Sequence, residues 1–174
     1  MNLNRLQGLL YSVGLLAMPC FLGTGCHSVP KPRAWNVSIV KETPATIDVD
    51  LIGVSSLEKP DWANYNLNEY WNNPNDPRRK EAQQSGDLVS FGLKKGEASV
   101  LKIDDPHWKK WFSHGASELL ILARLPGSFS GGADDARRKF LYLGKSDWDA
   151  HKKTIEIEVQ NTRIRVLTPQ IPRD

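Results

Sequence analysis

The chain has 174 residues, of which 40% are hydrophobic, and it carries 23 lysines and arginines against 20 aspartates and glutamates. This length is typical of one domain, and the hydrophobic fraction excludes a disordered tail. The net charge of +3 is too small to favour a protein that binds nucleic acid. Two cysteines are too few for a disulfide-rich scaffold.

The N-terminal segment has the pattern of an export signal. Arg5 is its only charged residue, and the stretch from Gly8 to Leu22 carries no charge. Because a bilayer span takes about 20 apolar residues, this stretch is short for a transmembrane helix and suits the apolar region of a signal peptide. The small residues 23–25 and then Cys26 follow it.

The sequence Gly23-Thr24-Gly25-Cys26 resembles the lipobox of bacterial lipoproteins, although the usual leucine stands one position further back, at Leu22. The resemblance implies cleavage by signal peptidase II before Cys26 and a diacylglyceryl and N-acyl lipid on that cysteine. More than one acyl chain gives a stable membrane anchor. His27, in place of the aspartate that retains lipoproteins in the inner membrane, implies the periplasmic face of the outer membrane. The alternative is an ordinary secretory signal that leaves Cys26 as a free thiol.

The sequence divides into a signal peptide over residues 1–25, a lipidated tether over 26–34 and one domain over 35–174. Pro30 and Pro32 favour an extended chain in the tether. About 150 residues remain after cleavage, and a chain of that size buries enough surface for a single core.

Alternating apolar and polar residues predict that most of the domain is β-strand. Trp35 to Val40 predicts a short strand, and residues 45–54 predict a strand with one buried and one exposed face. Residues 97–103 alternate more weakly. Residues 117–125 are apolar in the middle, which is typical of a central strand covered on both faces, and 139–143 predict another short strand.

The C-terminal part predicts an antiparallel hairpin. The segments Thr154 to Val159 and Asn161 to Leu167 alternate regularly, and Gln160 and Asn161 stand at the turn between them. Their outward glutamates and arginines are expected to pair across the strands and to form a solvated face rather than a binding site.

One segment, residues 104–112, predicts a helix. Asp105 is a suitable N-cap, Pro106 suits the first helical position, and Gly115 ends the helix about two turns later. About seven short strands and one helix, separated by loops, indicate an all-β protein: a single β-sandwich with one short inserted helix.

The sequence contains no motif that predicts catalysis. The four histidines do not stand at metal-ligand spacing, so no metal site is predicted. Residues 127–131 resemble the G-x-S-x-G nucleophile motif, but the central residue is Phe129 and not serine. No phosphate-binding loop, dinucleotide fingerprint or Cys–His pair occurs. The protein is therefore predicted not to be an enzyme and to hold no cofactor other than the lipid on Cys26.

Residues 55–79 combine aromatic side chains with asparagines, prolines and arginines, and they are expected to form a polar loop. Because tryptophan, tyrosine and arginine dominate interface hot spots, this loop is a candidate partner-binding surface. The candidate contact residues are Trp62, Tyr65, Tyr70, Trp71, Arg78 and Arg79. Alternatively, Trp62 and Trp71 fold back to plug the ends of the sandwich. A second, Gly/Ser-rich loop, 126–138, is long enough to be functional and is expected to be flexible.

The lipobox-like cysteine, short tether and single sandwich with a small helix together resemble the TssJ family, the outer-membrane lipoproteins of bacterial type VI secretion. Residues 46–56 (TIDVDLIGVSS) resemble the family's first sandwich strand and the start of its first loop. Residues 117–127 (SELLILARLPG) resemble its late central strand, and residues 154–167 (TIEIEVQNTRIRVL) its closing hairpin.

The resemblance implies a transthyretin-like β-sandwich that binds the periplasmic part of the inner-membrane protein TssM, partly through the loop after the first strand. That loop corresponds here to Ser55 to Tyr65, with Trp62 as the expected anchor, so Trp62→Ala is expected to weaken partner capture and to leave the fold intact. The sequence departs from the family here, because Lys59-Pro60-Asp61-Trp62 replaces its Asn-Pro-rich loop and an Asn-rich insertion follows.

The predicted function is that of an outer-membrane-anchored periplasmic lipoprotein that docks a TssM-like protein and tethers a trans-envelope secretion complex. An alternative is a carbohydrate-binding lipoprotein module in which Trp62, Tyr70 and Trp71 stack against sugars. A lysozyme- or protease-inhibitor lipoprotein fits less well, because such proteins often carry disulfides and Cys26 would be the only cysteine after cleavage.

Overall fold

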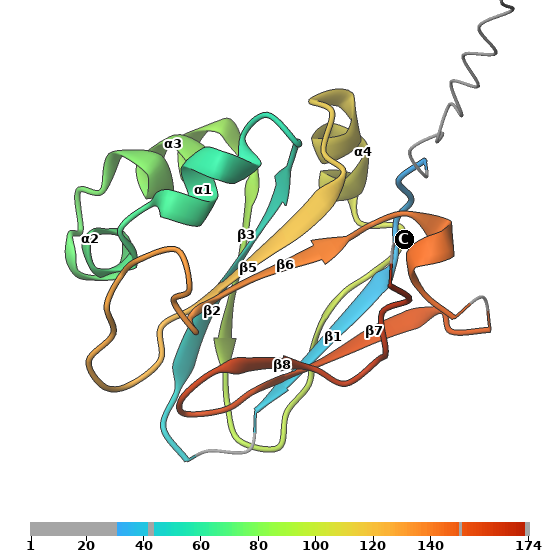
Figure 1. Cartoon of the computed structure of the whole chain (residues 1–174). Coiled ribbons are helices and arrows are strands. Elements are labelled where there is room, and N and C mark those ends of the chain that lie inside the picture. Colours follow the sequence, from blue (N-terminus) through green and yellow to red (C-terminus); the bar gives the residue numbers. More distant parts are fainter. Residues whose placement is uncertain (1–30, 42–43, 150, 173–174) are drawn as a thin grey trace, which may run out of the picture.

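Two four-stranded sheets face each other in the computed structural model, which describes residues 31–41, 44–149 and 151–172 (Figure 1). One sheet has the order β4-β1-β7-β8 and the other the order β3-β2-β5-β6. Strands β1 and β7 run parallel, and the other pairs within the two sheets are antiparallel. The strands are β1 (Asn36–Lys41), β2 (Ile47–Val54), β3 (Leu88–Leu93), β4 (Ser99–Leu101), β5 (Glu118–Ala123), β6 (Arg138–Tyr142), β7 (Thr154–Val159) and β8 (Ile164–Val166). The predicted β-sandwich is therefore confirmed.

The main core lies between the two sheets. Successive side chains of a strand point to opposite faces, so Ile39 of β1 and Ile157 of β7 meet Leu51 of β2 and Leu119 of β5, and all four are fully buried. Trp108, Trp111 and Trp148 are also buried in this core.

The second sheet also has a covered outer face. Helices α1 (Lys59–Asn64), α2 (Leu67–Asn72) and α3 (Pro77–Ser85) lie across it, on the side away from β1, β7 and β8 (Figure 1). Strand β5 is buried at every position, which confirms its prediction as a central strand. The expectation that one face of residues 45–54 is exposed holds for Thr46 and Asp48 but is wrong for the C-terminal half, because Asp50, Ile52 and Val54 of β2 are buried under the helices.

Helix α4 (Pro106–Ser113) confirms the one predicted helix, and Asp105 caps it by accepting a hydrogen bond from the His107 N–H. The expectation of a single helix is wrong, because α1, α2 and α3 occupy the segment predicted to be a polar loop. Helix α3 begins with the same pair of residues as α4: Asp76 caps it, and Pro77 follows. Its C-cap is Gly86, whose positive φ of 67° favours glycine.

The predicted C-terminal hairpin is confirmed. Ile157 of β7 pairs with Val166 of β8, and Val159 pairs with Ile164. Its charged face is only partly solvated, because Glu158 is buried, with Arg165 at 4.0 Å. A 3-10 helix, η1 (Lys145–Asp147), follows β6.

The signal peptide, Cys26 and most of the predicted tether lie outside the described residues. The described end of that tether packs against the sandwich: the Arg33 N–H donates to the Leu143 carbonyl at 3.0 Å, and the Arg33 guanidinium lies 3.7 Å from the centre of the Trp35 ring. No helix in the described part of the chain is both long enough and apolar enough to span a bilayer.

Candidate functional site

The six candidate contact residues come together on the helices that cover the second sheet, but most of their aromatic rings face inwards. Tyr70 and Trp71 of α2 are 0% and 4% exposed, and Trp62 of α1 is 8% exposed. The expectation of outward aromatics is therefore wrong for these three residues. Trp62 and Trp71 fold back, as the alternative expected, but onto the outer face of the second sheet rather than the ends of the sandwich. The reason is that the outer face of β2 and β5 is apolar, with Ile52 and Leu120 among its residues, and the rings cover it.

Two arginines of α3 stack against these rings. The Arg78 guanidinium lies 4.9 Å from the centre of the Trp62 ring and 4.8 Å from that of Tyr65. The Arg79 guanidinium lies 4.9 Å from the Trp71 ring centre. Such contacts contribute about 0.5–2 kcal/mol, depending on how far they are removed from water. The two arginines thus hold α3 against the rings of α1 and α2.

A buried carboxylate fixes this layer to the sheet. Asp50 of β2 is fully buried, and its side chain accepts hydrogen bonds from Tyr70 Oη at 2.9 Å, Arg79 Nε at 2.9 Å and Ser90 Oγ at 2.5 Å. Burial, together with the charge of Asp50, raises the pKa of Tyr70. Burial alone would lower the pKa of Arg79, but the charge of Asp50 and its hydrogen bond outweigh this effect and raise it.

Tyr65 lies between α1 and α2 and is only partly buried. Its hydroxyl donates to Asp76 Oδ2 at 2.6 Å, while the other oxygen of Asp76 accepts from the Arg79 N–H. Burial and this hydrogen bond raise the pKa of Tyr65 to about 12. Tyr65 therefore stays neutral at physiological pH and ties the α1–α2 segment to the start of α3.

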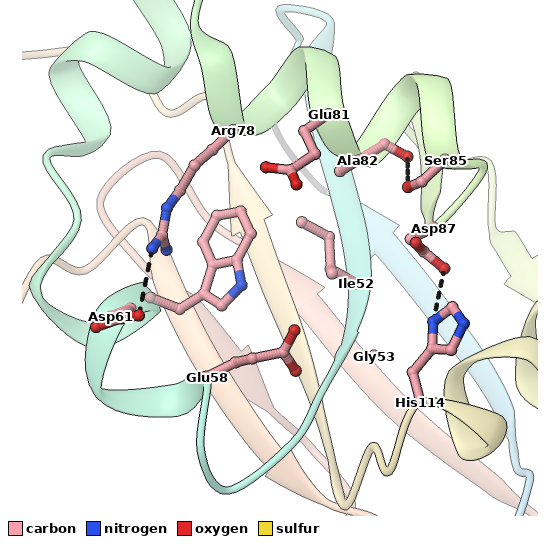
Figure 2. Close-up of a pocket in the computed structure, with 11 residues that line it drawn as sticks. Ile52, Gly53, Glu58, Asp61, Arg78, Glu81, Ala82, Ser85, Asp87 and His114 are labelled. Carbon is pink, nitrogen blue, oxygen red and sulfur yellow. Dashed lines mark hydrogen bonds and ion pairs between the residues drawn. The ribbon is translucent and has the colours of Figure 1, made fainter.

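A cleft of about 340 Å³ opens beside this layer, between α1, α3 and the C-terminal end of α4 (Figure 2). Four carboxylates line it, those of Glu58, Asp61, Glu81 and Asp87, against one arginine, Arg78. The other lining residues are Ile52, Gly53, Trp62, Ala82, Ser85 and His114.

The acidic character of this cleft is only partly neutralised from within. Arg78 lies 3.6 Å from Asp61, and His114 lies 3.7 Å from Asp87. Lys110 adds a positive charge 3.4 Å from Asp87. Figure 2 shows the Glu81 carboxylate inside the cleft, with no dashed contact to the other residues drawn. An excess of negative charge in a concave surface favours a cationic group as its occupant.

Leu57 is the most exposed large apolar residue in the described part of the chain, with an exposed fraction of 88%. It lies in the turn from Ser55 to Glu58, beside the cleft. This turn is held by the Glu58 carboxylate, which accepts hydrogen bonds from the Ser55 N–H at 2.9 Å and the Ser55 hydroxyl at 2.7 Å. Leu57 could not be identified from the sequence, because a single leucine among polar residues has no periodicity that indicates its exposure.

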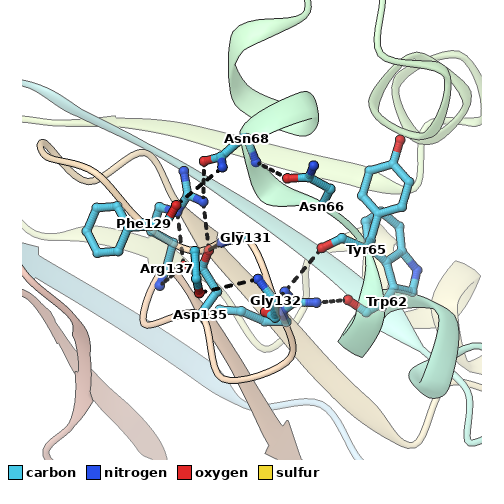
Figure 3. Close-up of polar contacts among 11 residues, drawn as sticks. Trp62, Tyr65, Asn66, Asn68, Phe129, Gly131, Gly132, Asp135 and Arg137 are labelled. Atoms are coloured by element: carbon cyan, nitrogen blue, oxygen red, sulfur yellow. Dashed lines mark hydrogen bonds and ion pairs between the residues drawn. The ribbon is translucent and has the colours of Figure 1, made fainter.

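The loop predicted to be flexible, 126–138, is pinned to α1 and α2 (Figure 3). Its second arginine, Arg138, is buried and donates hydrogen bonds to the carbonyls of Trp62, Tyr65 and Gly132. Burial lowers the pKa of Arg138. This guanidinium therefore joins the loop that was expected to be flexible to the carbonyl groups of the α1–α2 segment.

Arg137 and Asp135 form a second buried connection between this loop and α2. Arg137 Nη2 donates to Asp135 Oδ2 at 2.6 Å and to Asn68 Oδ1 at 2.8 Å. Burial alone would raise the pKa of Asp135, but the hydrogen bonds from Arg137 and the Gly131 N–H outweigh it and hold this pKa below its ordinary value of 3.8. Figure 3 shows these residues between the loop and α2.

The described residues contain no group of three or more histidines, cysteines, aspartates or glutamates arranged to hold a metal ion. Two of the four carboxylates of the cleft already pair with cations of the chain, Asp61 with Arg78 and Asp87 with Lys110.

No known protein family matches the sequence, and no curated protein matches it. Among solved structures, a chain described as "Type VI membrane complex" superposes with a TM-score of 0.50 and 14% identity, over 79% of this chain and 99% of that chain. The type VI secretion lipoprotein TssJ1 from Pseudomonas aeruginosa gives a TM-score of 0.42 at 15% identity, over 83% of this chain and 100% of that one. Serratia marcescens Lip, a membrane-bound component of the type VI secretion system, gives 0.45 at 14%, over 83% and 100%.

At this level of identity the likeness concerns the fold. The resemblance to a component of type VI secretion that the sequence suggested is confirmed for the fold. The chain has the β-sandwich fold of the chain from the type VI membrane complex.

Proposed function

We propose that this protein is an outer-membrane lipoprotein of a type VI secretion complex, anchored by lipid on Cys26, and that its sandwich docks a TssM-like partner protein in the periplasm. The observation that carries the proposal is the fold shared with the type VI membrane-complex chain, 99% of which is matched. The lipobox-like sequence before Cys26 supports the same setting from a different part of the chain. The proposed role is attachment and requires no catalytic group.

The docking face that fits this role consists of Leu57, Glu58, Asp61 and Glu81. Leu57 supplies an apolar side chain on a turn that is already held by hydrogen bonds, so little conformational entropy is lost when a partner binds it. The three carboxylates belong to the neighbouring cleft. The face therefore suits a partner segment that presents an apolar side chain next to a lysine or arginine.

This assignment moves the expected anchor of the interface from Trp62 to Leu57. Trp62 forms part of the cleft wall, but its ring is buried against Tyr70 and Ile52 in a second core, the apolar layer between helices α1–α3 and the second sheet. The carbohydrate-binding alternative has less support, because Tyr70 and Trp71 are buried and offer no open ring face for a sugar.

The lipid anchor is tested by changing Cys26 to serine in the full chain. We expect the altered protein to leave the membrane fraction and appear in the periplasm, and mass spectrometry of the unaltered protein to find an acylated N-terminal cysteine. Cys20→Ser is the matched control, because Cys20 lies within the expected leader and its change should preserve anchoring. Retention of the Cys26→Ser protein in the membrane would refute the anchor.

The docking face is tested by capture of the TssM-like protein encoded by the same organism. Leu57→Ala is expected to reduce its affinity by about tenfold or more and to leave the free energy of unfolding unchanged, because the side chain is solvated. Leu167→Ala is the matched control, since Leu167 is also exposed but lies after β8. Equal capture by the unaltered chain and the Leu57→Ala variant would exclude this face.

A further inference from the structure

Strand β3 lies at an edge of the second sheet, and the register shows which of its backbone groups are unpaired. The Arg124 N–H donates to the Asp48 carbonyl at 2.8 Å, so Asp48 of β2 turns its backbone groups toward β5. In an antiparallel ladder these groups alternate between the two neighbouring strands. Val49 and Leu51 of β2 therefore turn their N–H and C=O groups toward β3.

The partners of Val49 and Leu51 in β3 are Phe91 and Val89, so these two residues use their backbone groups within the sheet. The alternate residues Leu88, Ser90 and Gly92 turn their N–H and C=O groups to the outer edge. Among the described residues no strand pairs with that edge, because β3 is last in the sheet order.

The other three edge strands of the sandwich carry features that discourage pairing with another chain. Strands β4 and β8 have three residues each, and β6 contains Arg138 and Lys139. Strand β3 is six residues long, has the sequence LVSFGL without a charge or a proline, and pairs with β2 without a bulge. A long, uncharged edge of this kind is a template for an added strand.

We infer that β3 pairs antiparallel with β3 of a second copy of this chain and joins the two sheets into one. The opposite charges at the two ends of the strand favour a second copy as the pairing partner. Asp87 precedes β3, and Lys94 and Lys95 follow it. Antiparallel pairing brings the acidic end of each strand to the basic end of the other, although Asp87 also lies near Lys110 of its own chain.

One register of the two β3 strands allows both the backbone hydrogen bonds and the pairing of opposite charges. With Phe91 opposite Phe91 of the second copy, Ser90 lies opposite Gly92, and both residues have outward backbone groups as a hydrogen-bonded pair requires. Asp87 then lies opposite Lys95 of the second copy, at both ends of the joined strands. Phe91 is only partly buried against the main core, and an aromatic pair across non-hydrogen-bonded positions would cover it further.

The experiment is analytical ultracentrifugation of the full chain in mild detergent, from about 10 μM to about 1 mM, because a pairing of one short strand is expected to be weak. The unaltered chain should form a reversible dimer. Gly92→Pro removes an outward N–H and should weaken the dimer by at least about tenfold, with little change in the thermal unfolding midpoint, because proline is tolerated at a sheet edge.

Gly92→Ala is the matched control, because it adds a Cβ at a site with nothing within 4 Å and keeps the N–H, so the dimer should persist. Lys95→Glu should weaken the dimer severalfold through the charge at each end. In a second measurement, Phe91→Cys should give a disulfide-linked dimer above the background of the unaltered chain, and Val100→Cys, on exposed β4, should not.

A chain that stays monomeric up to the highest concentration would overturn the inference, as would a dimer of undiminished affinity in Gly92→Pro. If the unaltered chain is monomeric and Gly92→Pro instead abolishes capture of another protein, the edge serves a different partner and the assignment to a second copy is wrong.

Discussion

Arg79 Nε lies 2.9 Å from Asp50 Oδ2, and this ion pair joins helix α3 to the middle of strand β2. The Asp50 side chain is completely buried, whereas Arg79 is partly exposed. A carboxylate is costly to bury without partners, and here Tyr70 and Ser90 also donate to it. The pair therefore determines where the helices sit on the sheet.

Asp50→Ala is expected to lower the free energy of unfolding by about 3 kcal/mol, because it leaves a guanidinium and two hydroxyl groups without their acceptor. Urea denaturation measures this change. Arg165→Ala serves as the control, since its pair with Glu158 spans 4.0 Å on a largely exposed side chain and should contribute below about 1 kcal/mol. Equal effects of the two changes would mean that the Asp50 contacts do not fix the helices.

Trp62→Ala is expected to destabilise the fold by about 3–5 kcal/mol, in contrast to the expectation from the sequence that the fold stays intact. The reason is that the ring is buried and packs at 6.1 Å from the Tyr70 ring, so its removal leaves a cavity. Thermal or urea unfolding provides the measurement. A loss of less than about 1 kcal/mol would indicate that the ring is not part of the second core.

Gly53→Ala is expected to cost about 1–3 kcal/mol through overpacking. A Cβ at position 53 of β2 would overlap Cβ and Cγ of the Trp111 side chain, which is itself buried in the main core. Gly92→Ala is the control, because the space around that position is open. The thermal unfolding midpoints of the Gly53→Ala and Gly92→Ala variants measure this cost. Equal midpoints would mean that the packing of α4 on β2 does not require a glycine at position 53.

Asp135→Asn is expected to reduce stability at neutral pH, and the difference from the unaltered chain should shrink in acid. The pKa of Asp135 is held below 3.8 in the folded state, so the unfolded state takes up its proton first as the pH falls. The stabilisation by this carboxylate is therefore present above about pH 3.8 and is lost as the pH falls through the folded pKa. Denaturation at pH 7 and at successively lower pH values measures it. A difference that is constant with pH would show that the carboxylate charge does not contribute.

Helices α3 and α4 show what capping residues can and cannot predict from the sequence. Asp105-Pro106 and Gly115 predicted α4, and Asp76-Pro77 and Gly86 give α3 the same start and end. Only α4 was predicted, from its capping residues, and the same Asp-Pro start was overlooked in α3. In the structure α4 buries Trp108 and Trp111, whereas Ala82 is the one buried residue of α3. Capping residues without an apolar face were not enough to distinguish a helix from a polar loop.

The residues of the docking face could not be predicted from the sequence, because contacts between distant segments decide which side chains stay exposed. The sequence predicted that residues 55–79 matter for binding, and it named aromatic side chains as the contact residues. Those aromatics are the larger apolar side chains of the segment, and the uncovered face of β2 and β5 takes them up. Leu57 remains outside because the Ser55–Glu58 turn holds it away from the sheet.

The sequence by itself determined every strand except β3, and with them the sandwich and the C-terminal hairpin, because the two-residue alternation of a strand is a local property of the sequence. Only the tertiary structure decided that a layer of helices covers the second sheet, that Asp50 lies beneath it and that Arg138 secures the 126–138 loop. These outcomes rest on apolar surface and polar groups far apart in the chain, and their partners are fixed only when the two sheets and the helices have packed together.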